Sequence, residues 1–273
     1  IATIPVNAKD ATSFGILKSN SDSVITSFIE KPSADLLPDW TSEVSDDMKS
    51  QGRNYLASMG IYIFNRDLLI KLMSDPSTND FGKEIIPQSI KSHKTLSYQY
   101  EGYWTDIGNI DSFFEANIGL TDDIPKFDLY DKSKRIYTRA RMLPTTKLAN
   151  TVVEKSVIAE GCIISAAKIE KSVIGIRSRI GDESTVINTY MMGCDKYETL
   201  EEINQNKTEI LMGIGQRCFI KNAIIDKNCR IGDDVKINGG KHLEDTETDD
   251  YCIKDGIVVI KKGAVLPKKF TIQ

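Results

Sequence analysis

The chain has 273 residues, of which 40% are hydrophobic, and its formal net charge at pH 7 is -4. This length predicts two globular domains, and the acidic excess argues against a general binder of nucleic acids or anionic membranes. No apolar run approaches the 18 residues of a membrane-spanning helix, and the five cysteines form no C-x-x-C pair, so we predict reduced thiols without a disulfide framework or zinc site.

Residues 1–116 alternate between strand-like and helical segments. Strands are predicted at SVITSFIE, SMGIYIFN and KTLSYQYE, which are rich in β-branched and aromatic residues. Helices are predicted at RDLLIKLM and IDSFFEANIGL, whose apolar residues recur at helical spacing. This alternation is typical of an α/β sheet domain. Because IATIPV reads as a strand already under way, we also expect residues before Ile1 in the natural protein.

Residues 117–150 show no clean period and carry prolines near both ends, which predicts a connector laid over a surface. The connector is basic, and either a solvated face or an anion-binding face accounts for its charge. Its basic residues include Lys132, Lys134, Arg135, Arg139 and Arg141.

From residue 151 the hydrophobic period changes to five or six residues. Neither a helix nor an alternating strand has this spacing, but one short strand on each face of a triangular coil does. Glycines that follow the repeated aliphatics predict tight turns between faces, and the acidic segment 195–211 reads as a loop that leaves one coil. We therefore predict a parallel β-helix over residues 151–273. The repeated aliphatics are Ile158, Ile164, Ile169, Ile174, Ile180, Val186, Ile214, Ile220, Ile225, Ile231 and Ile237.

A strand that ends in Glu30 and Lys31, beside Pro32, puts two charges at a sheet edge. Lysine can neutralise a sugar phosphate as a compact point charge, and glutamate can accept hydrogen bonds from sugar hydroxyls. Taken alone, a Glu-Lys pair is usually a solvated surface feature, which is the alternative interpretation of these two residues.

Three further segments, SMGIY, DFGKEIIP and GYWTDIG, carry polar or aromatic side chains of the kind found in sugar sites. Ser58 and Tyr62 can bind hydroxyls, Trp104 can flank a sugar ring, and Asp106 has the hard oxygen that magnesium prefers. The structural alternatives are a core position for Tyr62, a sheet-edge position for Trp104, and a cap by Asp106 on the following helix.

The order FIEKP, LASMGIYIF, DFGKEIIP, GYWTDIG, FDLYD and RIYTRARMLP, followed by hexapeptides, resembles the ADP-glucose pyrophosphorylase (glucose-1-phosphate adenylyltransferase) family over nearly the whole chain. AIIDKNCRIGDDVKI and YCIKDGIVVIKKGAVLP are especially similar to its plant and cyanobacterial branch. The resemblance implies part of a nucleotidyltransferase-like α/β sheet domain at 1–116, the connector at 117–150, and a C-terminal left-handed parallel β-helix at 151–273.

The resemblance also implies an activity. Members transfer adenylyl from ATP to α-D-glucose 1-phosphate, with Mg²⁺, and the ADP-glucose formed supplies glycogen or starch synthesis. In such an in-line displacement the protein contributes positioning and charge neutralisation. A homotetramer is implied as well, in the bacterial cytoplasm or, alternatively, a plastid.

Residue roles follow from the same resemblance. Lys31 and Asp106 match the catalytic positions: Lys31 holds the phosphate of glucose 1-phosphate, and Asp106 binds the magnesium ion. For an anionic effector, a sugar phosphate or phosphoglycerate, the implied residues are Arg141, Lys227 and Lys254, which otherwise read as surface cations. The implied substrate-binding residues are Glu30, Lys31, Ser58, Tyr62, Asp80, Phe81 and Trp104.

One family feature is missing from these 273 residues: the glycine-rich GGGxGTRL-type loop that cradles the ATP phosphates. The family's second magnesium aspartate also lies upstream of the segments matched here. We therefore expect a truncated chain that holds the sugar half of the site. Two alternatives remain open: a nucleotidyltransferase for another nucleotide or sugar phosphate, and a non-catalytic regulatory subunit of the same enzyme.

Overall fold

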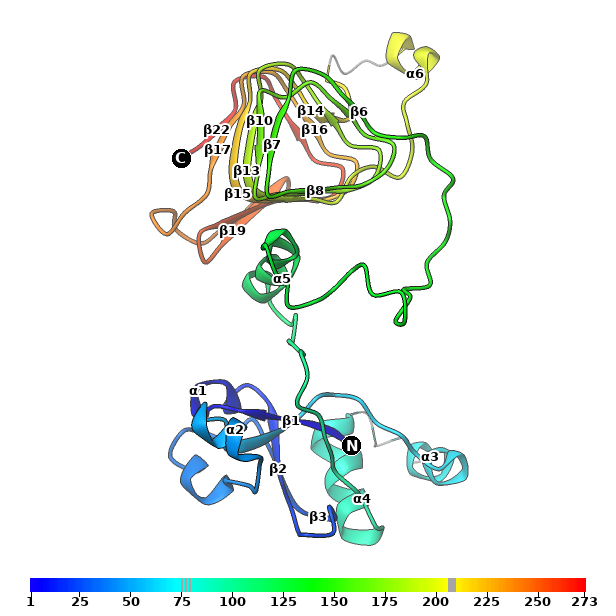
Figure 1. Ribbon diagram of the computed structural model, residues 1–273, viewed down its shortest axis with the longest axis vertical. Coiled ribbons are helices and arrows are strands. Elements are labelled where there is room, and N and C mark those ends of the chain that lie inside the picture. Colours follow the sequence, from blue (N-terminus) through cyan, green and yellow to red (C-terminus); the bar gives the residue numbers. More distant parts are fainter. Residues whose placement is uncertain (75, 77, 79, 206–209) are drawn as a thin grey trace. The chain divides into compact units, whose positions relative to one another are not determined.

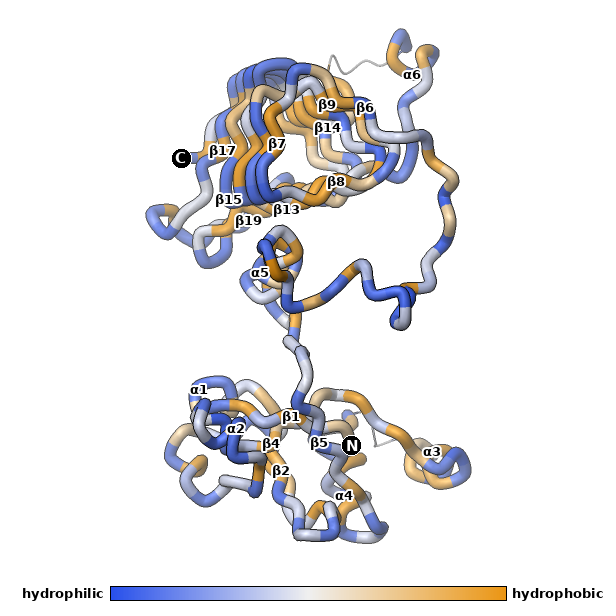
Figure 2. The backbone as a smooth tube through the Cα atoms, in the orientation of Figure 1, coloured by the Kyte–Doolittle hydropathy of each residue, from blue (hydrophilic) through white to orange (hydrophobic). Residues whose placement is uncertain are grey.

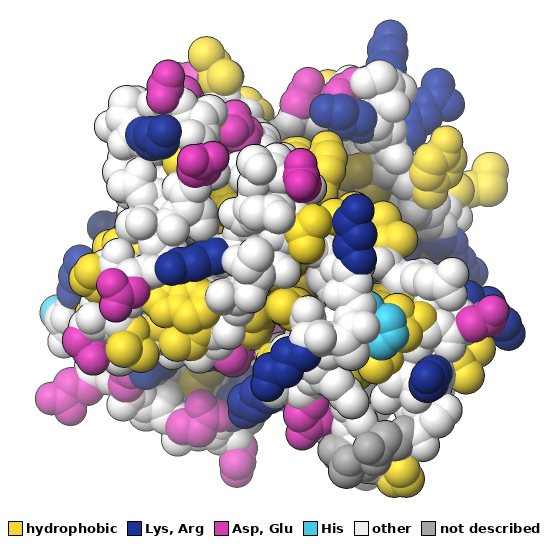
Figure 3. All heavy atoms as spheres, turned by 90° about the horizontal axis from the view of Figure 1, so that it is seen from below, with side chains coloured by type: hydrophobic (Ala, Val, Ile, Leu, Met, Phe, Trp, Pro, Cys, Tyr) yellow, Lys and Arg dark blue, Asp and Glu magenta, His cyan; other side chains and the backbone are white. Residues whose placement is uncertain are grey.

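The computed structural model describes residues 1–74, 76, 78, 80–205 and 210–273 (Figure 1). The chain forms two compact units, Ile1–Trp104 and Thr105–Gln273. The first is an α/β sheet domain and the second a parallel β-helix, which confirms the predicted fold class. Basic and acidic side chains are interspersed over the face shown in Figure 3. Within the described ranges, no helix is both long and apolar enough to cross a membrane.

The first unit is built on a mixed five-stranded sheet in the order β3-β2-β4-β1-β5. Its β2 residues Ile16 and Leu17 face opposite sides and join two separate apolar clusters, as the two-residue period of a strand requires. The sheet is therefore covered on both faces. The strands are β1 (Ala2–Val6), β2 (Gly15–Ser19), β3 (Ile25–Glu30), β4 (Tyr55–Ser58) and β5 (Tyr98–Gln99).

The described helices of this unit are short, and all but η1 (Leu37–Trp40) and α4 (Ile86–Ser92) begin at a polar side chain that caps them. The helix predicted at RDLLIKLM is confirmed as α3 (Arg66–Met73), and it begins where the Asn65 side chain accepts hydrogen bonds from the N–H groups of Asp67 and Leu68. The others are α1 (Ala8–Ala11), η1 (Leu37–Trp40), α2 (Asp46–Ser50), η2 (Phe81–Ile85) and α4 (Ile86–Ser92).

The strand predicted at SMGIYIFN is wrong, because β4 ends at Ser58 and the chain leaves the sheet there. Gly60 adopts a φ of +71°, a left-handed conformation that breaks strand geometry, and Asn65 already caps the next helix. Only Tyr98–Gln99 of KTLSYQYE pairs as a strand.

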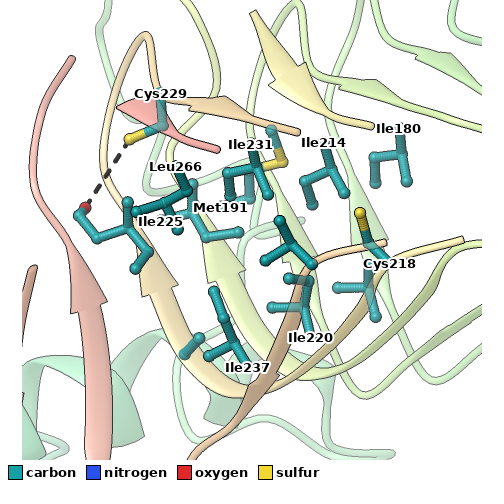
Figure 4. Close-up of a cluster of buried hydrophobic side chains, with 14 of the residues drawn as sticks. Ile180, Met191, Ile214, Cys218, Ile220, Ile225, Cys229, Ile231, Ile237 and Leu266 are labelled. Atoms are coloured by element: carbon teal, nitrogen blue, oxygen red, sulfur yellow. Dashed lines mark hydrogen bonds between the residues drawn. The ribbon is translucent and has the colours of Figure 1, made fainter. Parts of the chain in front are cut away.

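In the second unit, short parallel strands stack coil upon coil (Figure 2). The predicted aliphatics belong to its core, with Ile158 only partly buried, and Figure 4 shows six of them: Ile180, Ile214, Ile220, Ile225, Ile231 and Ile237. Ile180, Ile214 and Ile231 occupy equivalent places on one face, and Val186, Ile220 and Ile237 on another. The strands are β6 (Lys147–Leu148), β7 (Val152–Glu154), β8 (Val157–Ile158), β9 (Ile163–Ile164), β10 (Lys168–Glu170), β11 (Val173–Ile174), β12 (Arg179–Ile180), β13 (Thr185–Met191), β14 (Gly213–Ile214), β15 (Phe219–Ile225), β16 (Arg230–Ile231), β17 (Lys236–Asn238), β20 (Ile257–Ile260), β21 (Val265–Leu266) and β22 (Thr271–Ile272).

The glycines after the repeated aliphatics serve a different purpose from the predicted one. Gly181 does not adopt a left-handed φ, but a Cβ added to it would lie 2.7 Å from the carbonyl carbon of Gly215 in the next coil. Glycine is therefore required because successive coils approach closely, not because the chain turns tightly.

Two segments leave the regular coils. Residues 195–211 form the predicted excursion and contain α6 (Leu200–Gln205), while residues 206–209 lie outside the described ranges. The second is a hairpin of β18 (Thr246–Glu247) and β19 (Tyr251–Lys254), which pairs antiparallel with β20.

The helix predicted at IDSFFEANIGL is present as α5 (Ile110–Ile118), followed by η3 (Gly119–Thr121). Its Phe114 and Ile118 pack with Ile224 and Ile257 of the β-helix in one buried cluster. Because of this contact, the division between the compact units falls after Trp104, whereas the sequence placed boundaries at 116 and 150. Residues 122–146 contain no helix or strand.

All five cysteines are free thiols. Four of them are buried in the β-helix, and burial raises the pKa of the Cys229 thiol to about 12. Such thiols are unreactive structural groups.

Candidate functional site

The Glu30–Lys31 pair lies at the edge of the first unit's sheet. Glu30 is the last residue of β3 and pairs with Gly15 of β2. Lys31 has a left-handed φ of +47°, and its N–H donates to the carbonyl oxygen of Phe14 (3.1 Å). A lysine that precedes a proline is strained in this conformation, and such strain is often stored at functional sites. The Lys31 side chain is exposed.

Packing between aromatic rings brings together the predicted residues Ser58, Tyr62 and Phe81. The Tyr62 ring stacks on Phe81 with centroids 5.5 Å apart and an interplanar angle of 10°, and Phe64 packs against both rings at a tilt. The Tyr62 hydroxyl lies 3.4 Å from Oγ of Ser58, at the end of β4. Ser58, Tyr62 and Phe81 are therefore neighbours, although they come from separate motifs.

Asp80 has a local structural role. Its Oδ1 accepts a hydrogen bond from the N–H of Lys83 (2.8 Å), and its own N–H donates to Oε2 of Glu84 (3.2 Å). This reciprocal pair caps η2, which opens with Phe81 and continues into α4. The capping role was not foreseen, and substrate contact by Asp80 stays a prediction.

The segments from the sheet edge and from the aromatic group meet at Gly82. A Cβ added to Gly82 would lie 3.0 Å from Oε2 of Glu30, so the residue next to Phe81 touches the end of β3. On the other side, Trp104 packs edge-on against Phe14, with ring centroids 5.6 Å apart. These contacts join Glu30, Lys31, Ser58, Tyr62, Asp80, Phe81 and Trp104 in one neighbourhood of the first unit.

Asp106 belongs to the second unit and is exposed. It does not cap α5, because the side chain of Asn109 accepts the hydrogen bond from the N–H of Ser112 (2.8 Å). Within the described ranges, no group of three or more acidic, histidine or cysteine side chains is placed to hold a metal ion. A single carboxylate fits Mg²⁺ only together with substrate phosphates and water, which is a common way to bind this ion.

The predicted effector residues do not form one cluster. The N–H of Asp226, next to Lys227, donates to the carbonyl oxygen of Ile260 (3.0 Å), and the N–H of Gly263 donates to the carbonyl oxygen of Lys227 (2.9 Å). Since Ile225 pairs with Ile260, this register stacks Lys262 on Lys227 at the corner that follows β15 and β20. Lys254 lies opposite Ile257, at the other end of β20, which is about 10 Å away at the usual rise of a strand. Arg141 is exposed and donates only to the carbonyl oxygen of Arg139 among the described residues. The residue that stacks on Lys227 is instead Lys262, which is evident from the pairing of β15 with β20 and not from the sequence motifs.

Lys227 and Lys261 each carry an acidic partner. Nζ of Lys227 lies 2.8 Å from Oδ1 of Asp195, and the hydrogen bonds from Lys227 and then Asn228 lower the pKa of the Asp195 carboxyl. Lys261 pairs with Glu247 of the hairpin, a hydrogen bond that raises the lysine's pKa. The two acids lie on the two segments that leave the regular coils.

Comparisons with known proteins match this architecture. Residues 1–123 match a family model described as nucleotidyl transferase, and residues 141–271 match one described as the GLGC left-handed parallel β-helix domain. Over 279 aligned residues the chain is 41% identical to the glucose-1-phosphate adenylyltransferase small subunit, chloroplastic/amyloplastic, of Triticum aestivum. The alignment covers 98% of this chain and 59% of the wheat protein, so the chain spans less than two thirds of that relative.

Proposed function

Since this chain belongs to the glucose-1-phosphate adenylyltransferase family, we propose that it takes part in adenylyl transfer from ATP to α-D-glucose 1-phosphate, which yields ADP-glucose and pyrophosphate. The observation that carries the proposal is the neighbourhood in the first unit. The resemblance assigned sugar-phosphate binding to residues of separate motifs, and seven of them are joined by contacts around Glu30 and Phe81.

In the proposed reaction, a phosphate oxygen of glucose 1-phosphate attacks the α-phosphorus of ATP and pyrophosphate leaves. Lys31 offsets the charge of the attacking phosphate, while Glu30 accepts hydrogen bonds from sugar hydroxyls. Asp106 would hold Mg²⁺, which would supply positive charge to offset that of the phosphates. Because the 273 residues contain no glycine-rich phosphate loop, the other residues that we assign serve the sugar-phosphate side.

Two measurements test the proposal. Calorimetric titration of the purified chain should detect the binding of glucose 1-phosphate. Binding of glucose 6-phosphate, whose phosphate lies at the other end of the sugar, should be much weaker. Pyrophosphate release should then be followed with glucose 1-phosphate and Mg²⁺, comparing ATP, UTP, GTP and dTTP. Turnover with a nucleotide other than ATP would favour the alternative nucleotidyltransferase. A chain that binds no glucose 1-phosphate would contradict the proposal and favour the regulatory-subunit alternative.

We further propose allosteric control by an anion, a sugar phosphate or phosphoglycerate, at the corner of Lys227 and Lys262. Support comes from these two cations, which stack on successive coils of the β-helix and which both act to lower the pKa of the Asp195 carboxyl. The earlier assignments of Arg141 and Lys254 remain weaker proposals, because neither side chain has a described contact with this corner.

Replacing Asp195 with asparagine is expected to tighten the binding of 3-phosphoglycerate two- to fivefold. The side chains of Lys227 and Asp195 are 39% and 49% exposed, and surface ion pairs are worth about 0.2–1 kcal/mol, which the incoming anion must overcome. Calorimetric titration measures the change. Asp128→Asn is the control, because it removes the same charge from the connector and should leave the affinity unaltered. Equal affinities in all three proteins would count against this corner as the anion site.

We also propose a homotetramer, since the strands at the ends of a β-helix offer faces for association. For location, the name of the wheat relative supports a plastid alternative to the bacterial cytoplasm.

A further inference from the structure

The carboxylate of Glu30 lies in a recess between two glycines. A Cβ added to Gly15 of β2 would lie 2.7 Å from Oε2 of Glu30, and one added to Gly82 of η2 would lie 3.0 Å from the same oxygen. Both distances are shorter than ordinary contact between carbon and oxygen. The space taken by Glu30 is therefore available only because both residues lack a side chain.

Gly82 has no conformational reason to be glycine. Its φ lies outside the left-handed region, and it occupies the second position of η2, where alanine would be the better helix former. The nearest atoms to an added Cβ are the carboxylate atoms of Glu30, followed by Oδ1 of Asp80 at 3.5 Å. The start of this helix also has π geometry, an irregularity frequent at functional sites.

The carboxylate that fills the recess is half-buried and has no hydrogen-bond or ion-pair partner among the residues that the structure describes. Lys31, the adjacent cation, is likewise unpaired within those residues and is exposed. No side-chain oxygen of the described, non-exposed residues is buried without a partner, so the carboxylate oxygens reach water, which the hydroxyls of a ligand can replace. The place of this carboxylate at a sheet edge, next to a free cation, suits neutral hydroxyl donors attached to a phosphate.

We infer that Gly15 and Gly82 are positioning residues for sugar recognition: they fix the Glu30 carboxylate where it accepts hydrogen bonds from the hydroxyls of the sugar phosphate. This inference rests on the proposed function and adds to it the residues that orient Glu30. Gly15 is the less suitable probe, because its added Cβ would also lie 2.5 Å from the ring of Phe28. Gly82 isolates the effect on Glu30.

Gly82→Ala should weaken glucose 1-phosphate binding by roughly tenfold to a hundredfold, the range of one hydrogen bond to a charged group. Binding of inorganic phosphate, measured in the same calorimetric titrations, should not change, because Lys31 is untouched. The melting temperature should stay equal or rise. Gln88→Ala, on the exposed face of α4, is the matched control and should alter neither affinity.

A second variant separates positioning from a general disturbance. Glu30→Asp shortens the side chain and removes the overlap, so adding Gly82→Ala to Glu30→Asp should cost less sugar affinity than adding it to the wild type. Full sugar affinity in Gly82→Ala, or equal losses in both backgrounds, would overturn the inference. A wild-type chain that binds no glucose 1-phosphate would instead contradict the proposed function.

Discussion

Replacing Ile220 with alanine should lower the free energy of unfolding of the β-helix by about 2–5 kcal/mol, the usual cost of truncating a fully buried aliphatic side chain. Ile220 is 0% exposed and lies between Val186 and Ile237 in the stacked register. Each coil contacts mainly its neighbours, so a cavity at this position weakens two interfaces between coils.

Separate probes of the two units show which unit loses stability in this variant. Both tryptophans, Trp40 and Trp104, belong to the first unit, so their fluorescence follows the unfolding of that unit in urea. Hydrogen exchange of peptides from residues 213–240 follows the β-helix. The variant should accelerate exchange there and leave the fluorescence transition in place. Ile136→Ala, at a site 60% exposed, should change neither measurement by more than about 0.5 kcal/mol. Unchanged exchange in the Ile220 variant would refute the predicted core.

The β-helix was predictable because its signal is local and repeated. Every coil places an aliphatic residue inside at a step of five or six, so the sequence reveals the buried face without knowledge of pairing. The first unit is harder, because its short apolar runs fit a strand or an irregular segment equally well. The chain between Ser58 and Asn65 shows this: one left-handed glycine, Gly60, decides the path.

Contacts between residues far apart in the sequence could not be predicted from the motifs. The apolar face of α5 could have packed against either unit, and only the structure pairs Phe114 and Ile118 with the β-helix. The recess of Glu30 likewise depends on Gly15 and Gly82, which are far apart in the sequence. Lys262 was missed because the hairpin separates it from Lys227 along the chain, although the register of β15 and β20 stacks the two residues on successive coils.

Removing the side chain of Lys31 should weaken the binding of glucose 1-phosphate by about a hundredfold. A lysine-to-phosphate contact combines charge neutralisation with hydrogen bonds worth about 1.5–3 kcal/mol each. Calorimetric titration of Lys31→Ala measures the loss, and inorganic phosphate binding should fall in parallel, unlike in Gly82→Ala. Lys91→Ala, which removes an equally exposed charge from α4, should bind as the wild type does.

Lys31→Gly distinguishes loss of charge from loss of structure. At a φ of +47° a lysine backbone is strained and a glycine is not, so this variant should be at least as stable as the wild type in urea. Its affinity for glucose 1-phosphate should nevertheless fall as far as that of Lys31→Ala. If Lys31→Gly kept wild-type affinity, the strained turn at the end of β3 would be a feature of the fold alone, and the sugar phosphate would have to bind elsewhere. If it loses affinity while gaining stability, the strain serves to direct the ammonium group toward the phosphate.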